Sequence, residues 1–270
     1  MTSVVEDTFD LMDRVVLVTG AAGLIGSHFC EILAKAHARV VAVDIDHQKT
    51  DDVVQKIRSQ NLCIEGYQAD ITDPTSVQTM MQRSYHKFGA LDVLVHCAAL
   101  DPKFDREHEQ NHTYTFEDFP LETWKTAIDV NLTGAFICTQ AAAKLMVKQG
   151  HGNIILFSSI YGMVAPDQRV YKDGSFKPPY YSVSKAGILG LTRYIASYYA
   201  GKNIRVNALS PGGIYNNHED AFVEAYSARS ISGRMAHVSE LDGALLFLAS
   251  NASSYMTGSN LVVDGGWTAW

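Results

Sequence analysis

Cysteine and proline are scarce in this sequence of 270 residues, which contains four cysteines and seven prolines. The cysteines lie far apart and lack the paired spacing of zinc sites and redox motifs. Each falls in an apolar stretch, so we expect four reduced thiols in the protein core, at Cys30, Cys63, Cys97 and Cys138. The spacing therefore predicts a protein without a metal site.

Positively charged residues are also few, because the sequence has 22 Lys and Arg and 29 Asp and Glu, which gives a net charge of −7. This balance argues against nucleic acid or an anionic membrane as the main partner. Residues 1–13 are acidic and lack the pattern of a signal peptide, and no apolar run approaches the roughly 20 residues that span a bilayer. We expect a cytoplasmic protein that binds a small-molecule substrate.

Short runs rich in β-branched residues alternate with helical patterns from Arg14 almost to the last residue. The runs that predict strands are 14–19, 39–44, 62–69, 91–97, 153–158, 203–209 and 260–263. Helical patterns lie near 24–36, 50–60, 74–87, 122–149, 181–200 and 239–249. This order predicts an α/β fold, a Rossmann-like doubly wound parallel sheet of about seven strands flanked by helices. Since composition shows no break, residues 1–270 are expected to form a single domain.

Polar, aromatic segments that contain proline interrupt this alternation at residues 100–119 and 161–179. Each follows a predicted strand, and loops after the carboxyl ends of parallel strands surround the ligand crevice of such sheets. We therefore expect both loops to face the substrate, and residues 214–236 to form a lid over it. The alternative is plain surface elaboration without a role in binding.

A glycine-rich turn joins the first predicted strand to the first predicted helix, with the sequence Thr19-Gly20-Ala21-Ala22-Gly23-Leu24-Ile25-Gly26. The pyrophosphate of a dinucleotide needs backbone N–H donors at a helix start and no side chain in the way. The turn has a strand before it and a helix after it, which is the context that this motif requires. The candidate cofactor-binding residues of this segment are Gly20, Gly23, Leu24, Ile25 and Gly26.

Asp44 ends the second predicted strand, where a carboxylate can accept hydrogen bonds from the ribose hydroxyls of adenosine. Its charge would repel a 2′-phosphate, and no Arg or Lys stands beside it, Lys49 being the only nearby base. Asp44 therefore favours NAD over NADP as the cofactor. Asp70, followed by Ile71 after the third predicted strand, is a candidate adenine contact, although it could instead cap the next helix.

Tyr181 and Lys185 lie four residues apart in a helical pattern, which places the phenol and the ammonium on one face. A tyrosine that exchanges a proton near neutral pH needs its pKa lowered by about three units, or about 4 kcal/mol. An ammonium about 5 Å away at an effective dielectric constant of about 20 supplies roughly 3 kcal/mol. A positive nicotinamide would add to this, whereas burial of the phenolate opposes both. The pair is therefore adequate for acid–base catalysis.

Together with these motifs, several further segments resemble the short-chain dehydrogenase/reductase family, in order, from about residue 13 to residue 267. They are Val130-Asn131-Leu132-Thr133-Gly134, Ser158-Ser159, Pro211-Gly212-Gly213-Ile214, Thr257-Gly258 and Val263-Asp264-Gly265-Gly266. The resemblance implies an NAD-dependent oxidoreductase of the single-domain type. It also implies a homo-oligomer, either a dimer or a homotetramer, and the long predicted helices 122–149 and 181–200 suit such contacts.

The same resemblance implies a role for each residue of the catalytic set. Tyr181 would be the acid/base, Lys185 would lower its pKa and bind the nicotinamide ribose, and Ser159 would orient the substrate oxygen. Asn131 would hold a water that relays protons, although a polar residue that satisfies a helix kink suits the same position. Further implied cofactor contacts are Ala98, Pro211, Gly212 and Ile214, the last through its backbone to the nicotinamide carboxamide.

Some positions depart from the family pattern. The glycines at 20, 23 and 26 follow the extended branch of the family, the segment after the fourth strand reads His96-Cys97-Ala98-Ala99, and Asn216 replaces a common threonine. The chain ends after its seventh predicted strand, which favours the shorter architecture. The glycine spacing nevertheless leaves a nucleotide-sugar epimerase or dehydratase open as an alternative, and a catalytically silent NAD-sensing protein as another.

The predicted loops and lid carry many polar side chains. Basic residues are Lys103, Arg106, Arg169, Lys172, Lys177 and Arg229, with Tyr161, Tyr171, Tyr215 and His218 among them. Such walls suit a hydroxylated substrate such as a sugar, a sugar acid or another polyol derivative. Long basic side chains are also common on solvated surfaces, so each of them could be uninvolved.

Overall fold

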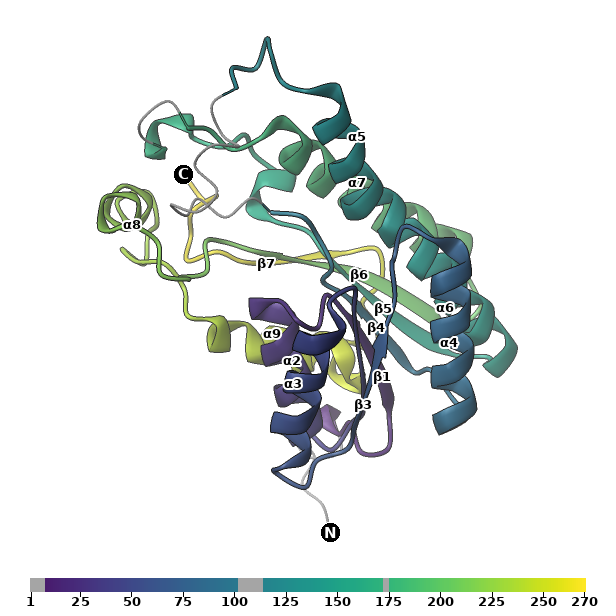
Figure 1. Ribbon diagram of the computed structural model, residues 1–270. Helices are drawn as coiled ribbons and strands as arrows, with labels where there is room; N and C mark the ends of the chain where they lie inside the picture. Colours follow the sequence, from purple (N-terminus) through teal and green to yellow (C-terminus); the bar gives the residue numbers. More distant parts are fainter. Residues whose placement is uncertain (1–7, 102–113, 172–174) are drawn as a thin grey trace.

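The computed structural model describes residues 8–101, 114–171 and 175–270 (Figure 1). Seven parallel strands form one sheet in the order β3-β2-β1-β4-β5-β6-β7. Their bounds are β1 Val15–Thr19, β2 Arg39–Asp44, β3 Ile64–Gln68, β4 Val93–His96, β5 Gly152–Phe157, β6 Ile204–Pro211 and β7 Asn260–Val263. The predicted doubly wound parallel sheet is confirmed.

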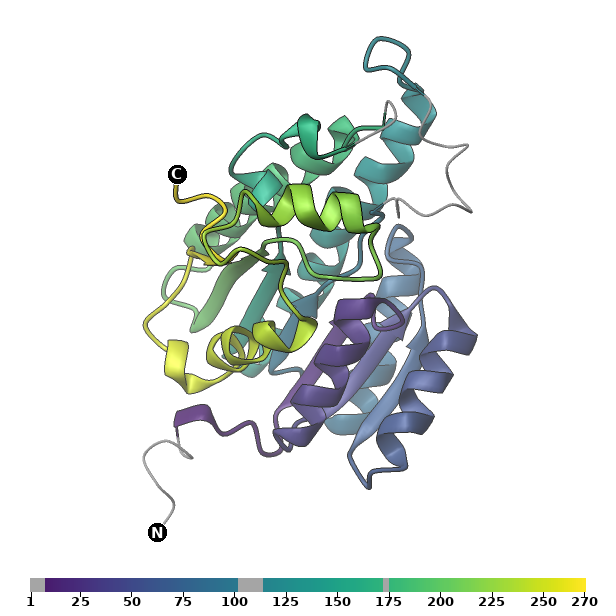
Figure 2. The ribbon, with the colours of Figure 1, turned by 90° about the vertical axis from the view of Figure 1, so that its left-hand side faces the viewer.

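Helices cover both faces of this sheet, because alternate side chains of each strand point to opposite faces (Figures 1 and 2). Val16 and Val18 of β1 pack with α2, α3 and α9, whereas Val15 and Leu17 pack with α4, α6 and α7. The helix bounds are α2 Leu24–Lys35, α3 His47–Arg58, α4 Pro74–Phe88, α5 Leu121–Ile128, α6 Gly134–Gln149, α7 Pro179–Tyr198, α8 Asp220–Ser227 and α9 Asp242–Ala249. The fold therefore has three layers, with the sheet between two layers of helices.

The helix predicted over residues 122–149 is interrupted by a π-helical turn at Asp129–Thr133, between α5 and α6. By length and composition Leu121–Gln149 could cross a membrane. Its inner face packs on the sheet, however, through Ala135, Cys138, Ala142 and Met146. We therefore interpret the segment as a core helix of the layered fold.

Three local expectations are wrong. β3 begins at Ile64 rather than at residue 62, and this leaves Cys63 exposed instead of in the core. α3 begins at His47, three residues before the predicted start, because the Asp46 side chain accepts from the backbone N–H of Lys49 and caps the helix. The lid segment contains the helix α8, which the sequence pattern did not indicate.

The order of the sheet reverses between β1 and β4, and this is the point where ligands bind in open α/β sheets. The chain after β2 and β3 continues on one side of that point, and the chain after β5 and β6 continues on the other. Residues far apart in sequence therefore meet along the carboxyl edge of the sheet.

Candidate active site

A cleft of about 740 Å³ opens along this carboxyl edge. Most of the residues predicted for the site line it. They are Gly20, Gly23, Leu24, Ile25, Gly26, Asp44, Asp70, Ile71, Ala98, Ser159, Tyr181, Lys185, Pro211, Gly212 and Ile214. Asn131 does not. Among the described residues no group of three or more His, Cys, Asp or Glu side chains is placed to hold a metal ion.

The glycine turn is closed by backbone contacts that leave no room for larger residues. Gly20 has a φ of +72°, and a Cβ there would lie 2.7 Å from the Cα of Ala98. A Cβ on Gly26 would lie 2.0 Å from the carbonyl oxygen of Gly20. No described side chain caps the N-terminus of α2, so its first N–H groups point into a cradle that suits a pyrophosphate.

Asp44 is held at the end of β2 by two backbone donors. Its Oδ2 accepts from the N–H of Ala22 at 3.0 Å, and its Oδ1 accepts from the N–H of Asp46 at 3.1 Å. The Nζ of Lys49 lies 2.9 Å from the Oδ2 of Asp46, and this contact raises the Lys49 pKa. The one base near Asp44 is therefore engaged by another carboxylate. The turn and Asp44 together fit the phosphates and the adenosine ribose of a dinucleotide.

Asp70 lies at the next strand end, where its Oδ1 accepts from both the N–H and the hydroxyl of Thr72. The cap of α4 is Asp73, whose side chain accepts from the N–H of Thr75. The alternative interpretation of Asp70 as a helix cap is therefore wrong. Asp70 and Ile71 line the adenosine end of the cleft.

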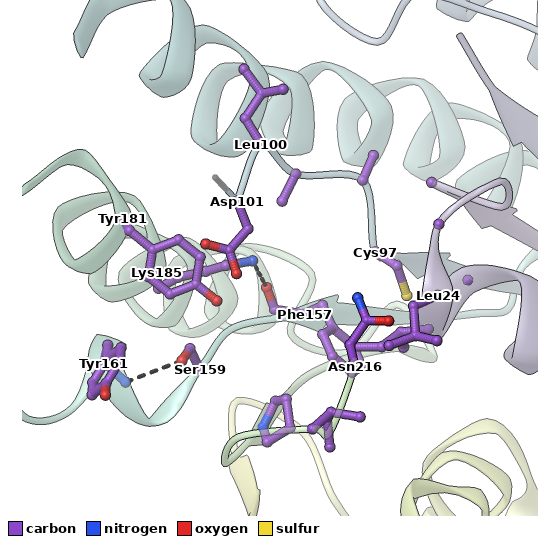
Figure 3. A pocket seen from close by; sticks show the side chains of 18 of the residues that line it. Leu24, Cys97, Leu100, Asp101, Phe157, Ser159, Tyr161, Tyr181, Lys185 and Asn216 are labelled. Carbon is purple, nitrogen blue, oxygen red and sulfur yellow. Dashed lines mark hydrogen bonds between the residues drawn. The ribbon is translucent and has the colours of Figure 1, made fainter. Parts of the chain in front are cut away.

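Tyr181, Lys185 and Ser159 come together at the other end of the cleft (Figure 3). The first two lie in the opening turns of α7, and Ser159 follows β5. The Nζ of Lys185 donates to the carbonyl oxygen of Phe157 at 2.9 Å and lies 5.7 Å from the centre of the Tyr181 ring. The hydroxyl of Ser158 donates to the carbonyl oxygen of Lys185 at 2.8 Å, which ties α7 to β5.

Burial dominates the acid–base properties of this pair. Loss of water raises the Tyr181 pKa well above its usual value, the charge of Asp101 raises it further, and a hydrogen bond with Ser159 lowers it only in part. Burial also lowers the Lys185 pKa to about 8. In the protein without cofactor, burial and Asp101 thus shift the Tyr181 pKa away from neutrality, and the Lys185 ammonium donates to Phe157. A lowering of this pKa by Lys185 together with a positive nicotinamide stays a prediction.

Asn131 lies in the π-helical turn and is buried outside the cleft lining. Its Oδ1 accepts from the N–H of Leu100 at 2.6 Å, and its Nδ2 donates to the carbonyl oxygen of Leu100 at 3.0 Å. A third contact joins Nδ2 to the Oγ of Ser184 at 3.4 Å. Asn131 therefore anchors the chain after β4 to the helices beneath it, and a water-holding role remains a prediction.

The polar loops are divided between two cavities. Lys177 lines the main cleft, whereas Arg169 and Arg229 both pair with Asp167 and line a second cavity beside Trp267. The expectation that these two arginines face the main cleft is therefore wrong. Lys103, Arg106 and Lys172 lie outside the described residues.

Sequence reasoning missed Asp101, whose Oδ1 lies 2.5 Å from the Nζ of Lys177 inside the cleft. The signal that could have found it is a lone acidic residue shortly after a strand end. It also missed the inner face of the lid, where Phe222, Tyr226 and Met235 line the cleft.

His218 of the lid lines the cleft and stacks on Phe222. Burial is the largest cause of its lowered pKa, so the ring is neutral near pH 7. Its Nδ1 accepts from the N–H of Asn216 at 3.2 Å, and the proton of the neutral ring is therefore on Nε2. His218 offers a hydrogen-bond donor at Nε2.

Three comparisons place this geometry among known proteins. A family model described as enoyl-(acyl carrier protein) reductase matches residues 20–268. The cis-4-hydroxycyclohexanecarboxylate dehydrogenase of Sinomonas cyclohexanicum is 36% identical over 264 residues, which cover 95% of this chain and 97% of that protein. The D-threitol dehydrogenase of Mycolicibacterium smegmatis is 30% identical over 269 residues, which cover 98% of this chain and 96% of that protein.

A solved structure of a gluconate 5-dehydrogenase from Burkholderia cenocepacia, in complex with NADP and tartrate, has a TM-score of 0.87 and 28% identity. The match covers 98% of this chain and 99% of that chain. These matches extend over nearly all of the sheet and helices described above, and they confirm the family that the sequence motifs indicated. The chain belongs to the short-chain dehydrogenase/reductase family and is an oxidoreductase that acts on CH–OH groups.

Proposed function

We propose that this protein transfers a hydride between NAD(H) and a secondary alcohol or ketone of a polar sugar, sugar acid or polyol derivative. One observation carries the proposal: Tyr181, Ser159 and Lys185 converge at one end of a cleft whose other end fits a dinucleotide. The nicotinamide cofactor, when bound, supplies the acceptor or donor of the hydride. The side chains of this protein handle the proton.

In the direction of alcohol oxidation, Tyr181 accepts the proton of the substrate hydroxyl and Ser159 orients the same oxygen. This requires a phenolate, which burial disfavours in the protein alone. Lys185 binds the nicotinamide ribose and contributes positive charge near the phenol. Asn131 positions the segment after β4, and a water held there would relay the proton outward.

The preference for NAD rests on Asp44. A 2′-phosphate would lie against its carboxylate, and Lys49 is already paired with Asp46. The relative from Burkholderia cenocepacia was solved with NADP, so cofactor choice varies among similar proteins. The orientation of Asp44 by Ala22 and Asp46 supports NAD for this chain.

The polar substrate is supported by the walls of the cleft. Lys177, His218, Tyr161 and Tyr171 line its substrate end and offer charged and hydrogen-bonding groups that suit a hydroxylated substrate. The named substrates of the three similar proteins, a hydroxycyclohexanecarboxylate, threitol and gluconate, all carry an alcohol together with another polar group.

The test is an assay of NAD and NADP reduction with a panel of polyols, sugar acids and hydrophobic alcohols. We expect turnover with NAD and the polar set, and turnover confined to the hydrophobic alcohols would contradict the proposed substrate class. An epimerase or dehydratase would change a nucleotide sugar with no net reduction of NAD. A silent NAD-sensing protein would bind the cofactor without any turnover. A homo-oligomeric state and a cytoplasmic location complete the proposal.

A further inference from the structure

Lys177 is a buried cation held at a fixed position in the cleft. Only 8% of its side chain is exposed. Gln168 fixes its backbone from both sides, since the N–H of Lys177 donates to Oε1 at 2.9 Å and Nε2 donates to the carbonyl oxygen of Lys177 at 3.5 Å. The ammonium of Lys177 is therefore held at one position instead of moving freely in solvent.

That place adjoins the reacting atoms. The Nζ of Lys177 lies 3.9 Å from the centre of the Tyr181 ring. Because the ring and its hydroxyl form one rigid group, a substrate whose alcohol oxygen meets Tyr181 brings a group a few carbons away within reach of this ammonium. The charge of Lys177 also contributes to the lowered pKa values of Lys185 and His218.

Asp101 faces Lys177 across the cleft, with its Oδ1 2.5 Å from Nζ. The two partners differ in exposure, because 49% of the Asp101 side chain is exposed and Lys177 is buried. The half-exposed carboxylate of Asp101 can return to water at less cost than the buried ammonium of Lys177 can. Exchange of Asp101 for another carboxylate is therefore favoured over loss of the pair.

Other cations along the described chain are not available for this purpose. The ammonium of Lys185 is bound at the carbonyl oxygen of Phe157. Arg169 and Arg229 share Asp167 in the second cavity, away from the main cleft. Among the described residues, Lys177 is therefore the cation that a negatively charged substrate would meet.

We propose that Lys177 binds the carboxylate of a hydroxy-acid substrate, and that Asp101 is the counter-ion which this carboxylate displaces. The inference rests on the proposed function, because it names the substrate class for that same site. A neutral polyol leaves the Lys177–Asp101 pair intact, whereas a hydroxy acid replaces Asp101 with its own carboxylate. The site therefore selects for acids over alcohols of the same skeleton.

The test uses substrate pairs that differ in one group: D-threonate with D-threitol, and cis-4-hydroxycyclohexanecarboxylate with its hydroxymethyl analogue. We expect the wild-type protein to have the higher kcat/KM for at least one acid of these pairs. Lys177→Met should lower kcat/KM for that acid on the order of 100-fold, mainly through KM, and remove the preference. Lys177→Arg should retain it, and Asp101→Asn should lower the KM of the acid.

Arg229→Gln is the matched control, because it removes a cation from the second cavity, and it should behave as wild type. Calorimetric titration of both acids into the protein with NADH measures binding without turnover. If no alcohol of the panel is oxidised, the proposed function fails, and this titration on wild type and Lys177→Met still decides the inference. The inference would be overturned if wild type and Lys177→Met had the same preference for acid over alcohol. It would also be overturned if wild type preferred the alcohol in both substrate pairs.

Discussion

Asp44 has a structural task in the glycine turn and, in the proposed function, a selective one. It accepts from the N–H of Ala22 and so holds the glycine turn, while its charge faces the adenosine end of the cleft. Each negative charge of a phosphate about 4 Å from it, at an effective dielectric constant of about 20, would be repelled by about 4 kcal/mol. We therefore propose that its carboxylate separates NAD from NADP by charge.

We predict that Asp44→Asn lowers the ratio of kcat/KM with NAD to kcat/KM with NADP by roughly 10- to 100-fold. The asparagine retains an oxygen acceptor for Ala22, so the turn should remain closed. Steady-state kinetics with both cofactors measures the ratio, and Asp52→Asn on the exposed face of α3 serves as control. An unchanged ratio in Asp44→Asn would show that selectivity lies elsewhere.

His96 ends β4 fully buried, with Nδ1 2.9 Å from the hydroxyl of Thr19. Burial, and next the charge of Lys185, lowers its pKa from 6.5 to about 3. Since the unfolded chain then binds more protons than the native protein between these values, stability is lost as the pH falls through this window. The loss from this residue approaches about 1.4 kcal/mol per pH unit.

We predict that His96→Asn, which can keep the contact with Thr19 and does not titrate, loses less stability on acidification than wild type. Urea unfolding at pH about 6.5 and about 4.5 should give a difference of about 2 kcal/mol between the two losses. Parallel losses in both proteins would mean that His96 contributes nothing to acid unfolding.

Sequence spacing predicts those site residues whose geometry depends only on their neighbours in the chain. The glycine turn, Asp44, and the Tyr181–Lys185 pair could be predicted because a strand end or a helical turn fixes their geometry. The partners of Lys177 and Arg229 could not, since both are chosen by how separate loops meet. The extent to which burial raises the Tyr181 pKa could not be predicted either, because burial is a property of the packed site.

At the scale of elements, the π-helical turn at Asp129–Thr133 brings the Asn131 amide to Leu100. We predict that Asn131→Ala lowers the free energy of unfolding by about 2 kcal/mol, because the buried amide is lost and both backbone groups of Leu100 lose their partner. Turnover should fall as well, since the loop that carries Asp101 is released. Urea unfolding and steady-state kinetics measure the two effects.

Ser184→Ala is the control for this variant, because it removes the contact at 3.4 Å to Asn131 and the hydroxyl bond to the carbonyl oxygen of Tyr181 but leaves Leu100 paired with Asn131. Equal stability of the two variants would contradict an anchoring role for Asn131.

The sequence predicts one continuous helix over this segment, because the apolar spacing runs through the π-helical turn. The single residue that the π turn inserts hardly changes that spacing. The short helix α8 escaped prediction since its aromatic face packs on the cleft and on Trp267 rather than on the sheet.

At the scale of the whole molecule, the doubly wound type of sheet could be predicted, because seven apolar runs separated by helices have few right-handed arrangements. The positions of the loops over the cleft could not, since they depend on contacts between segments such as Asp101 and Lys177 that are 76 residues apart. The reaction class was therefore predictable, whereas the substrate-selecting pair required the structure.

Apolar side chains remain exposed on the outer faces of α6 and α7. Phe136 and Val147 lie on α6, and Tyr194 and Tyr198 stack on each other on α7. Exposed apolar side chains on helices, such as the stacked Tyr194 and Tyr198, are typical of association surfaces. We predict a dimer or tetramer by light scattering, and a smaller species for Tyr194→Lys combined with Tyr198→Lys. A wild-type monomer at micromolar concentration would contradict this prediction.

The central claim is that Tyr181 exchanges the proton during hydride transfer, and one measurement tests it most directly. It compares the rate of NAD reduction by the best alcohol of the panel in wild type, Tyr181→Phe and Tyr180→Phe, with NADH binding measured in each. Tyr180 is a matched control, because it is buried next in sequence but packs on Phe119 rather than lining the cleft. We predict a loss of roughly 100- to 10,000-fold for Tyr181→Phe with NADH binding retained, and wild-type rates for Tyr180→Phe. Wild-type turnover in Tyr181→Phe would contradict the account.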